Sequence, residues 1–481
     1  MRSVYPLVAL GTWASSVAAD LPLVASDVLQ RGLLRSALVE KSEALLSLAD
    51  DNTRLYGTSG HNKTVDWIQS ALSAYSNYYD VEVQPFQMPA VVTTFRASAT
   101  RFVADAMEMS PEGSVSAPLV LVADNGCAAA DFPPEVAGAI SLIKRGSCPF
   151  GQKSAIAGGA GAVGVIHYNN VGGRLTPFTL GNQSDYPQGP FAPTAGVSDV
   201  VGASLLSLLA AGPVHASLSI DSTELTTYNV FAQTKGGDQD NVLELGAHSD
   251  SVIEGRLSHH RLSAIPTDHV AQLLTNFSVN HAVRFSWFSA EEQGKRGSYH
   301  YLNSLSEEEL AGIRLFLNFD MIASPNYIYG IYDGDGSSFN VSGAAGSGEA
   351  EKLFEDFFAQ EGLPFEPIVL RLSDSLPFFE AGIPTGGLFT GATENKTDEQ
   401  AARFGGQAGV PFDLAYHTAL DDVNNLNLTA FLNNAKAIAH TVATYAVSWE
   451  GEYGVPKRTK RDLKARVRRP VWKKARKSAD T

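Results

Sequence analysis

The sequence contains little cysteine and, outside its last residues, few basic side chains, and both scarcities narrow the possible functions. Two cysteines in 481 residues exclude a small disulfide-framework protein and a metal site built from several thiolates. Residues 456–481 hold 12 Lys/Arg and 2 Asp/Glu, which leaves 24 and 49 in residues 1–455 and a net charge of −25 there. Because such an acidic body repels phosphate backbones and anionic lipids, nucleic-acid binding could come only from the basic tail, and we expect no nucleic-acid partner and no membrane partner.

Long apolar runs are absent after the first twenty residues, and so is the G-x-S-x-G motif of many serine hydrolases. No later stretch reaches the roughly 18–20 apolar residues that a membrane span needs. The run from Val4 to Ala19 follows Arg2 and ends in small residues, which is the pattern of a secretory signal peptide, with a buried first helix as the alternative. We therefore expect a secreted, extracellular chain that loses residues 1–19.

Six N-x-S/T sequons accompany that leader, and secreted chains carry glycans at such sites. The asparagines at which we expect glycosylation are Asn62, Asn182, Asn276, Asn340, Asn395 and Asn427. Cys127 and Cys148 would then meet an oxidising compartment, in which a disulfide is the favoured state.

The length of the chain and the changes of sequence pattern along it predict two globular units. Residues 27–78 have the apolar spacing of helices, whereas short β-rich runs with Gly and Pro fill residues 96–223. From residue 226 strand-like and helix-like segments alternate, which indicates an α/β fold with a mostly parallel sheet. The expected parts are a signal peptide (1–19), an N-terminal helical part (20–95), a β-rich insert (96–225), the remainder of the main domain (226–450) and a basic, disordered tail (451–481).

Polar side chains follow three strand-like runs of the second half, and a Tyr-His pair stands late in the chain. In chain order these residues are His248, Asp250, Glu291, Glu292, Asp320, Tyr416 and His417. Because the carboxyl ends of parallel strands meet at one edge of a sheet, we expect these groups to gather there. Imidazole and carboxylate ligands without thiolate suit zinc, and of two adjacent glutamates one can bind metal while the other acts as a general base.

At these residues the sequence resembles the co-catalytic dizinc aminopeptidases, and among them the fungal secreted leucine aminopeptidases with an inserted protease-associated domain. The matching segments span residues 30 to 450 and include 228–237, 246–252 (GAHSDSV), 289–292 (SAEE), 317–326 and 386–391. The insert resembles a protease-associated domain through 125–127, 143–150 and 160–166. The resemblance implies a mostly parallel sheet flanked by helices, a small β-rich insert, and pairing of Cys127 with Cys148.

The resemblance also implies a function, that of a secreted zinc aminopeptidase acting as a monomer on peptide substrates. Position by position it implies one zinc held by His248 and Asp320, a second held by Glu292 and His417, a general base in Glu291, a partner of His248 in Asp250, and a hydrogen-bond donor in Tyr416. We expect removal of N-terminal, leucine-like residues by water that the metals activate and Glu291 deprotonates.

One position departs from the family pattern. The carboxylate that bridges the two zinc ions is expected twelve residues after His248, where this chain has His260. A carboxylate has two oxygens that span two cations about 3.5–4 Å apart, whereas a neutral imidazole ligates only one metal. Three explanations are open: a mistaken exon boundary around residues 256–273, an inactive peptide-binding homologue, and an active enzyme with one zinc or a substitute ligand from His259, His260 or Asp268. With residues 256–273 as given, the expected zinc count falls from two to one or none.

This chain also departs from the family pattern at two smaller points, and its tail is basic. Family members have aromatic and apolar residues where this chain has 293–296 (QGKR), and an Arg where it has Leu372. The tail contains the dibasic pairs 457–458 and 460–461, which proteases of the secretory route cut. We therefore expect a mature C-terminus near residue 458 or 461.

Overall fold

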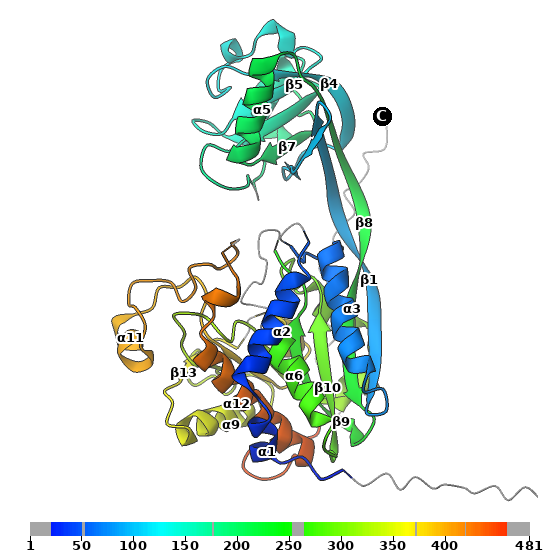
Figure 1. Ribbon diagram of the computed structural model, residues 1–481, viewed down its shortest axis with the longest axis vertical. Coiled ribbons are helices and arrows are strands. Elements are labelled where there is room, and N and C mark those ends of the chain that lie inside the picture. The colour runs from blue at the N-terminus through cyan, green and yellow to red at the C-terminus, as the bar shows by residue number, and fades with distance from the viewer. Residues whose placement is uncertain are drawn as a thin grey trace, which may run out of the picture. The chain divides into compact units, whose positions relative to one another are not determined.

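The computed structural model describes residues 21–50, 53–175, 178–252, 264–370, 373–418 and 420–458, and Figure 1 shows its ribbon. Two compact units divide the chain: the described residues up to Phe86 and from Thr226 onward form the main unit, and Gln87–Leu225 form the insert unit. Both borders fall within long strands, β1 (Tyr79–Ala97) and β8 (His215–Thr234). The signal peptide, His260 and the pair 460–461 lie outside the described residues.

The main unit contains a sheet whose strands run in the order β13-β12-β14-β11-β9-β10-β8. The strands after β8 are β9 (Asp238–His248), β10 (His281–Phe288), β11 (Ile313–Phe319), β12 (Gly330–Tyr332), β13 (Glu366–Ile368) and β14 (Thr385–Phe389). Neighbours β14, β11, β9 and β10 are parallel, while β12 runs antiparallel to β14 and β8 antiparallel to β10. The expected mostly parallel sheet is confirmed.

The central strands are apolar and buried along nearly their whole length, as parallel strands covered on both faces must be. In the β9–β10 register His248 lies beside Phe288, and in the β11–β9 register Asn318 lies beside Gly246. The carboxyl ends of β9, β10 and β11 therefore reach the same edge of the sheet.

Helices cover this sheet. They are α1 (Ser26–Arg31), α2 (Arg35–Ser47), α3 (Ser59–Ser73), α6 (Ala264–Leu274), α7 (Arg296–Ser304), α8 (Glu307–Gly312), α9 (Ser347–Gln360), α10 (Ser375–Glu380), α11 (Asp398–Phe404) and α12 (Leu428–Val447). Helices α6 and α12 contact β9 and β10, and apolar residues of α12 such as Phe431 and Ile438 join Trp287 of β10 in the largest core cluster. Each such fully buried side chain contributes about 1.5–3 kcal/mol. Among the helices of the described residues, none combines the length and apolar character needed to cross a bilayer.

In the insert unit the strand order continues from β8 through β4, β5, β6, β7 and β3. Its elements are β2 (Thr100–Phe102), β3 (Asp105–Ala106), β4 (Gly113–Leu121), β5 (Ile140–Lys144), β6 (Gly164–Tyr168), β7 (Thr194–Val197), α4 (Phe150–Gly159) and α5 (Asp199–Ala211). A separate apolar cluster, including Phe95, Leu142 and Ile166, forms its core. Cys127 and Cys148 form the expected disulfide, and the expected small β-rich insert is confirmed.

Two sequence expectations differ from the structure. Residues 79–95, expected to be part of the helical segment, belong to strand β1, whose side chains alternate between buried and exposed. The tail was expected to begin at residue 451, yet Val455 is completely buried and Arg458 is 8% exposed. The Arg458 guanidinium donates to the backbone oxygens of Leu310, Ile313 and Gly382, so its charge is satisfied inside the main unit.

Candidate functional site

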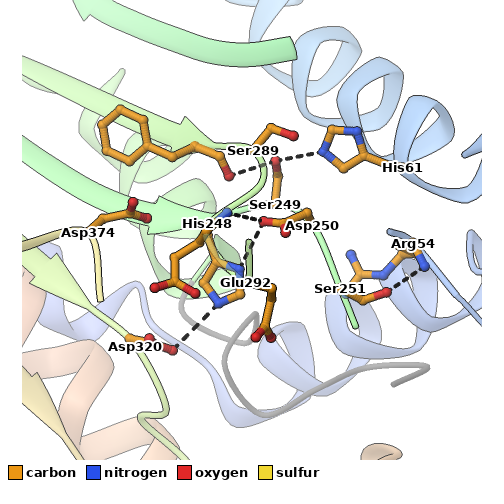
Figure 2. A network of polar contacts seen from close by, with 12 residues as sticks. Arg54, His61, His248, Ser249, Asp250, Ser251, Ser289, Glu292, Asp320 and Asp374 are labelled. Atoms are coloured by element: carbon orange, nitrogen blue, oxygen red, sulfur yellow. Dashed lines mark hydrogen bonds and ion pairs between the residues drawn. The ribbon is translucent and has the colours of Figure 1, made fainter. Parts of the chain in front are cut away.

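The seven polar residues singled out in the sequence come together at the carboxyl edge of the sheet. Figure 2 shows His248, Asp250, Glu292 and Asp320 there. His248 is the last residue of β9, Glu291 and Glu292 lie in the turn after β10, and Asp320 follows β11 directly. His417 comes from the long connection between α11 and α12. The site is thus built on the ends of rigid strands and completed by one loop.

His248 and Asp320 form the first imidazole–carboxylate pair. His248 Nε2 lies 3.7 Å from Asp320 Oδ1, and on the other side of the ring His248 Nδ1 lies 3.3 Å from Asp250 Oδ1. The same Asp250 oxygen accepts a hydrogen bond from the backbone N–H of Glu291, at 3.1 Å. Asp250 therefore orients the His248 ring and fixes the turn that carries the two glutamates.

Glu292 and His417 form the second pair, with Glu292 Oε1 3.2 Å from His417 Nε2. The Tyr416 ring stacks on the His417 ring, with centroids 3.9 Å apart and an interplanar angle of 13°. The two pairs meet, because single ligand atoms of His248, Glu291 and Glu292 all lie within 4.8 Å of one another. Each pair joins one imidazole to one carboxylate, the donor set that zinc prefers.

Buried negative charge is the main electrostatic feature of the site. The acids that contribute are almost completely buried: Asp250, Glu291, Glu292, Asp320 and Asp374. Burial by itself lowers the pKa of His248, but hydrogen bonds with Asp250 and Asp320 outweigh it and hold that pKa well above its usual value. Burial raises the pKa of Glu291, and neighbouring carboxylates add to the rise. A buried cluster of like charges requires a cation, so these residues fit a divalent metal.

Asp374 is a site residue that the sequence pattern did not single out. Its side chain is fully buried and accepts a hydrogen bond from Ser298 Oγ at 2.5 Å. Burial and the nearby charge of Glu291 raise the pKa of Asp374 well above its usual value. Asp374 precedes the short helix α10, where an aspartate looks like an ordinary capping residue. Only its position beside Glu291 distinguishes it from a cap.

Left-handed backbone conformations concentrate at this site. Non-glycine residues with φ between 47° and 59° that belong to the site or adjoin it are Ala290, Lys295, Met321, Ser373 and His417. Such conformations cost L-residues about 1 kcal/mol or more and persist where the surrounding structure holds them. Their clustering around the two imidazole–carboxylate pairs marks this edge as a functional site.

A buried network of hydroxyl and imidazole groups supports the ends of β9 and β10 (Figure 2). His61 of α3 forms a 3.0 Å hydrogen bond between its Nε2 and Ser249 Oγ, and Ser249 N donates to Phe288 O at 2.7 Å. Thr227 Oγ1 and Ser289 Oγ lie 2.6 Å apart. This network ties the end of β9 to the end of β10, so His248 and Glu291 keep a fixed spacing.

A pocket of about 400 Å³ opens over the site. Glu291, Glu292, Asp320 and Tyr416 line it, together with the half-buried Phe389 and the buried Met321. Glu394 and Lys295 add one acid and one ammonium group to its wall. The pocket therefore offers an apolar surface directly beside the expected metal ligands.

Two other groups considered as metal ligands lie in different surroundings. Asp268, a possible substitute ligand in the sequence, pairs with Lys41 at 2.6 Å and accepts from Gln272, so its carboxylate is already engaged. Asp333, which lies near Asp335 and Glu351 in a second acidic group, accepts hydrogen bonds from three backbone N–H groups of the following residues, as an aspartate in a turn does.

The glycosylation sequons differ in accessibility. Five of the six asparagines are exposed: Asn62, Asn182, Asn276, Asn340 and Asn395. Asn427 is half-buried, and its Oδ1 accepts from the backbone N–H groups of Thr429 and Ala430 at the start of α12. Its side chain therefore has a structural task as the cap of that helix.

Known proteins match most of this chain. Residues 229–442 match peptidase family M28, and residues 115–205 match the PA domain. The chain is 45% identical to leucine aminopeptidase 2 of Arthroderma otae, over 92% of this chain and 91% of that protein. It is 44% identical to the probable leucine aminopeptidase 2 of Aspergillus oryzae, over 96% and 95%.

Solved structures show the same fold. The zinc aminopeptidase BSAP of Bacillus subtilis superposes with a TM-score of 0.59 at 22% identity, covering 92% of this chain and all of that one. An aminopeptidase from Aneurinibacillus sp. strain AM-1 gives a TM-score of 0.51 at 25% identity, covering 90% and 98%.

Proposed function

Because this chain belongs to peptidase family M28 and is a metallo-aminopeptidase, we propose that it removes apolar N-terminal residues from peptides at a centre of two zinc ions. The observation that carries the proposal is the pairing of His248 with Asp320 and of Glu292 with His417 at one edge of the sheet. Each pair would hold one zinc. Zinc bound there would polarise the peptide carbonyl and make water more acidic.

The protein's own groups have separate tasks in this proposal. Glu291 takes a proton from the attacking water and passes it to the leaving amine, which completes the hydrolysis without any other acid. Its raised pKa suits a group that must both accept and donate that proton. Tyr416 lines the same pocket, and burial raises its pKa, so its hydroxyl stays protonated and donates to the oxyanion formed from the peptide carbonyl.

The pocket also accounts for trimming at N-termini. Phe389, which is half-buried, provides an apolar wall for a leucine-like side chain. Glu394 and the buried acids around it hold the free α-ammonium group of the substrate by charge. An internal peptide bond offers no ammonium group, so internal cleavage lacks this interaction.

Secretion, glycosylation and the monomeric state belong to the same proposal. The Cys127–Cys148 disulfide is compatible with an oxidising compartment. We propose glycans at the five exposed asparagines and none at Asn427, whose side chain caps α12. Peptides are the proposed partners, and the acidic main unit favours neither nucleic acid nor anionic membrane.

The second candidate is a catalytically inactive peptide-binding homologue, and one observation favours it. Position 260 is His where the bridging carboxylate is expected. On this second candidate, the chain lacks the bridge and binds one zinc or none. The two functions are separated by zinc analysis together with hydrolysis of leucyl-p-nitroanilide by the purified chain: less than one zinc and no hydrolysis would establish the binding protein and overturn the enzyme.

A further inference from the structure

Lys295 places a positive charge inside the acidic pocket. Its Nζ lies 3.5 Å from Glu291 Oε1, its side chain is 25% exposed, and it lines the pocket with Met321 and Phe389. Among the described residues Glu291 is the acid within ion-pair distance of this ammonium, which donates no hydrogen bond to any of them. The side chain is largely enclosed, and a substrate that enters the pocket can supply a further acceptor for its ammonium group.

The backbone at Lys295 holds this charge in place. The residue has φ 59° and ψ 37° and stands immediately before α7, with its N–H donating to Glu291 O at 2.7 Å. Gly294 also donates to that oxygen. The turn after the glutamate pair therefore presents the lysine toward Glu291, although glycine or asparagine would adopt the left-handed conformation more readily.

The position of Glu291 defines which part of a substrate Lys295 can reach. A group that hands a proton to the leaving amine lies about 2.6–3.2 Å from that nitrogen. In the residue that leaves, the carbonyl carbon is two bonds from this nitrogen, at about 2.5 Å. If that residue is the last of the peptide, its carbonyl carbon belongs to a carboxylate, and this carboxylate lies within reach of an ammonium 3.5 Å from Glu291.

From this geometry we propose that Lys295 binds a carboxylate carried by the second residue of the substrate. The chain then favours dipeptides, whose C-terminal carboxylate stands there, or peptides with an acidic side chain at the second position. This inference rests on the proposed aminopeptidase function and names its substrate class.

The test compares substrates that differ only in that carboxylate. For the full chain we expect kcat/KM for Leu-Gly to exceed that for Leu-Gly-NH2 by at least about tenfold, the size of a charge-assisted hydrogen bond. In Lys295→Met the ratio falls toward one, whatever the absolute rates, while Lys295→Arg retains most of it. Lys352→Met, which removes a lysine of α9 that pairs with Asp356, is the matched control and leaves the ratio as it is.

Two further substrates identify the source of the carboxylate and the directness of the contact. If kcat/KM is higher for Leu-Gly than for Leu-Asp-NH2, the site binds the C-terminal carboxylate. If kcat/KM is higher for Leu-Asp-NH2, the site binds an acidic side chain. Leu-Gly-Gly carries its carboxylate one residue farther, about 3.5 Å, and loses the advantage if the contact is direct. An equal advantage for Leu-Gly-Gly overturns the direct contact.

Failure of this inference and failure of the proposed function give different results. Leucyl-p-nitroanilide has no carboxylate, so its hydrolysis reports the aminopeptidase activity alone. If the chain hydrolyses leucyl-p-nitroanilide, and if Lys295→Met prefers Leu-Gly over Leu-Gly-NH2 as strongly as the unchanged chain does, only the lysine contact is overturned. If the chain hydrolyses nothing, calorimetric titration with Leu-Gly and Leu-Gly-NH2 still decides: equal affinities overturn the contact, and tighter binding of Leu-Gly that Lys295→Met abolishes supports it.

Discussion

Glu292 Oε1 lies 3.2 Å from His417 Nε2, although the two residues come from distant parts of the chain. One follows a buried central strand and the other lies in a loop, so only the folded sheet brings them together. Their pairing beside His248 and Asp320 gives the site two imidazoles and two carboxylates in two sets.

Loss of either member of the Glu292–His417 pair should remove the same zinc. We expect His417→Ala and Glu292→Ala each to lower the bound zinc by one ion per chain, and the double variant to lose no more than either single one, because both act on one site. Inductively coupled plasma mass spectrometry of the purified chains measures this. His215→Ala, at an exposed position of the insert unit, serves as the control. Unchanged zinc in both single variants would exclude the pair as ligands.

Glu291→Gln separates catalysis from metal binding. The amide cannot accept the proton of water, so we expect hydrolysis of leucyl-p-nitroanilide to fall by about 100- to 10,000-fold. Bound zinc should stay at the level of the unchanged chain, because Glu292 and His417 remain. Glu361→Gln, an exposed residue at the end of α9, is the control. Retained turnover in Glu291→Gln would remove the base role from this residue.

Acid should destabilise the insert unit through His167. This histidine is fully buried, its Nε2 lies 3.1 Å from Ser154 Oγ, and burial together with the charge of Lys153 lowers its pKa from 6.5 to about 3. A depressed histidine pKa means that the unfolded chain binds the proton more readily, so stability is complete above pH 6.5 and falls as the pH drops toward 3.

The replacement His167→Gln removes this titration. Between pH 6.5 and 4 we expect the midpoint of thermal unfolding of the insert unit to fall less in His167→Gln than in the unchanged chain, as followed by calorimetry. His215→Gln should behave like the unchanged chain. Parallel pH profiles for the unchanged chain and His167→Gln would show that His167 does not carry the effect.

Arg458 should stabilise the main unit and decide where the tail is cut. Arg458→Ala leaves three buried backbone oxygens without this donor, at a cost of about 2–4 kcal/mol in the free energy of unfolding by denaturant. Lys457→Ala, at an exposed position, should cost little. Because Arg458 is buried, a dibasic-cleaving protease should cut after Arg461 and spare the bond after Arg458. A secreted chain that ends at Arg458 by mass spectrometry would contradict this.

The sequence predicted the centre of the site because its residues end apolar strands. His248, Glu291 and Asp320 each follow a run of buried β-branched, leucine or aromatic residues, and such runs align at one edge of a parallel sheet. The fold followed from the same pattern, since alternating strands and helices have few compact arrangements.

Asp374, Lys295 and Arg458 show what the pattern could not supply. Asp374 resembles a helix cap and gains its role only from the proximity of Glu291. Lys295 lies in a segment whose sequence departs from the family pattern. The direction of its side chain toward Glu291, however, depends on the left-handed turn before α7. Arg458 stands in a basic segment that resembles a solvated tail, whereas its three acceptors come from α8, β11 and the end of α10, which only the fold assembles.

The zinc content of the purified full-length chain, measured beside its hydrolysis of leucyl-p-nitroanilide, decides whether this chain is a dizinc aminopeptidase. The two imidazole–carboxylate pairs predict two zinc ions per chain and turnover that a chelator abolishes and added zinc restores. Less than one zinc per chain with no turnover would contradict the dizinc aminopeptidase.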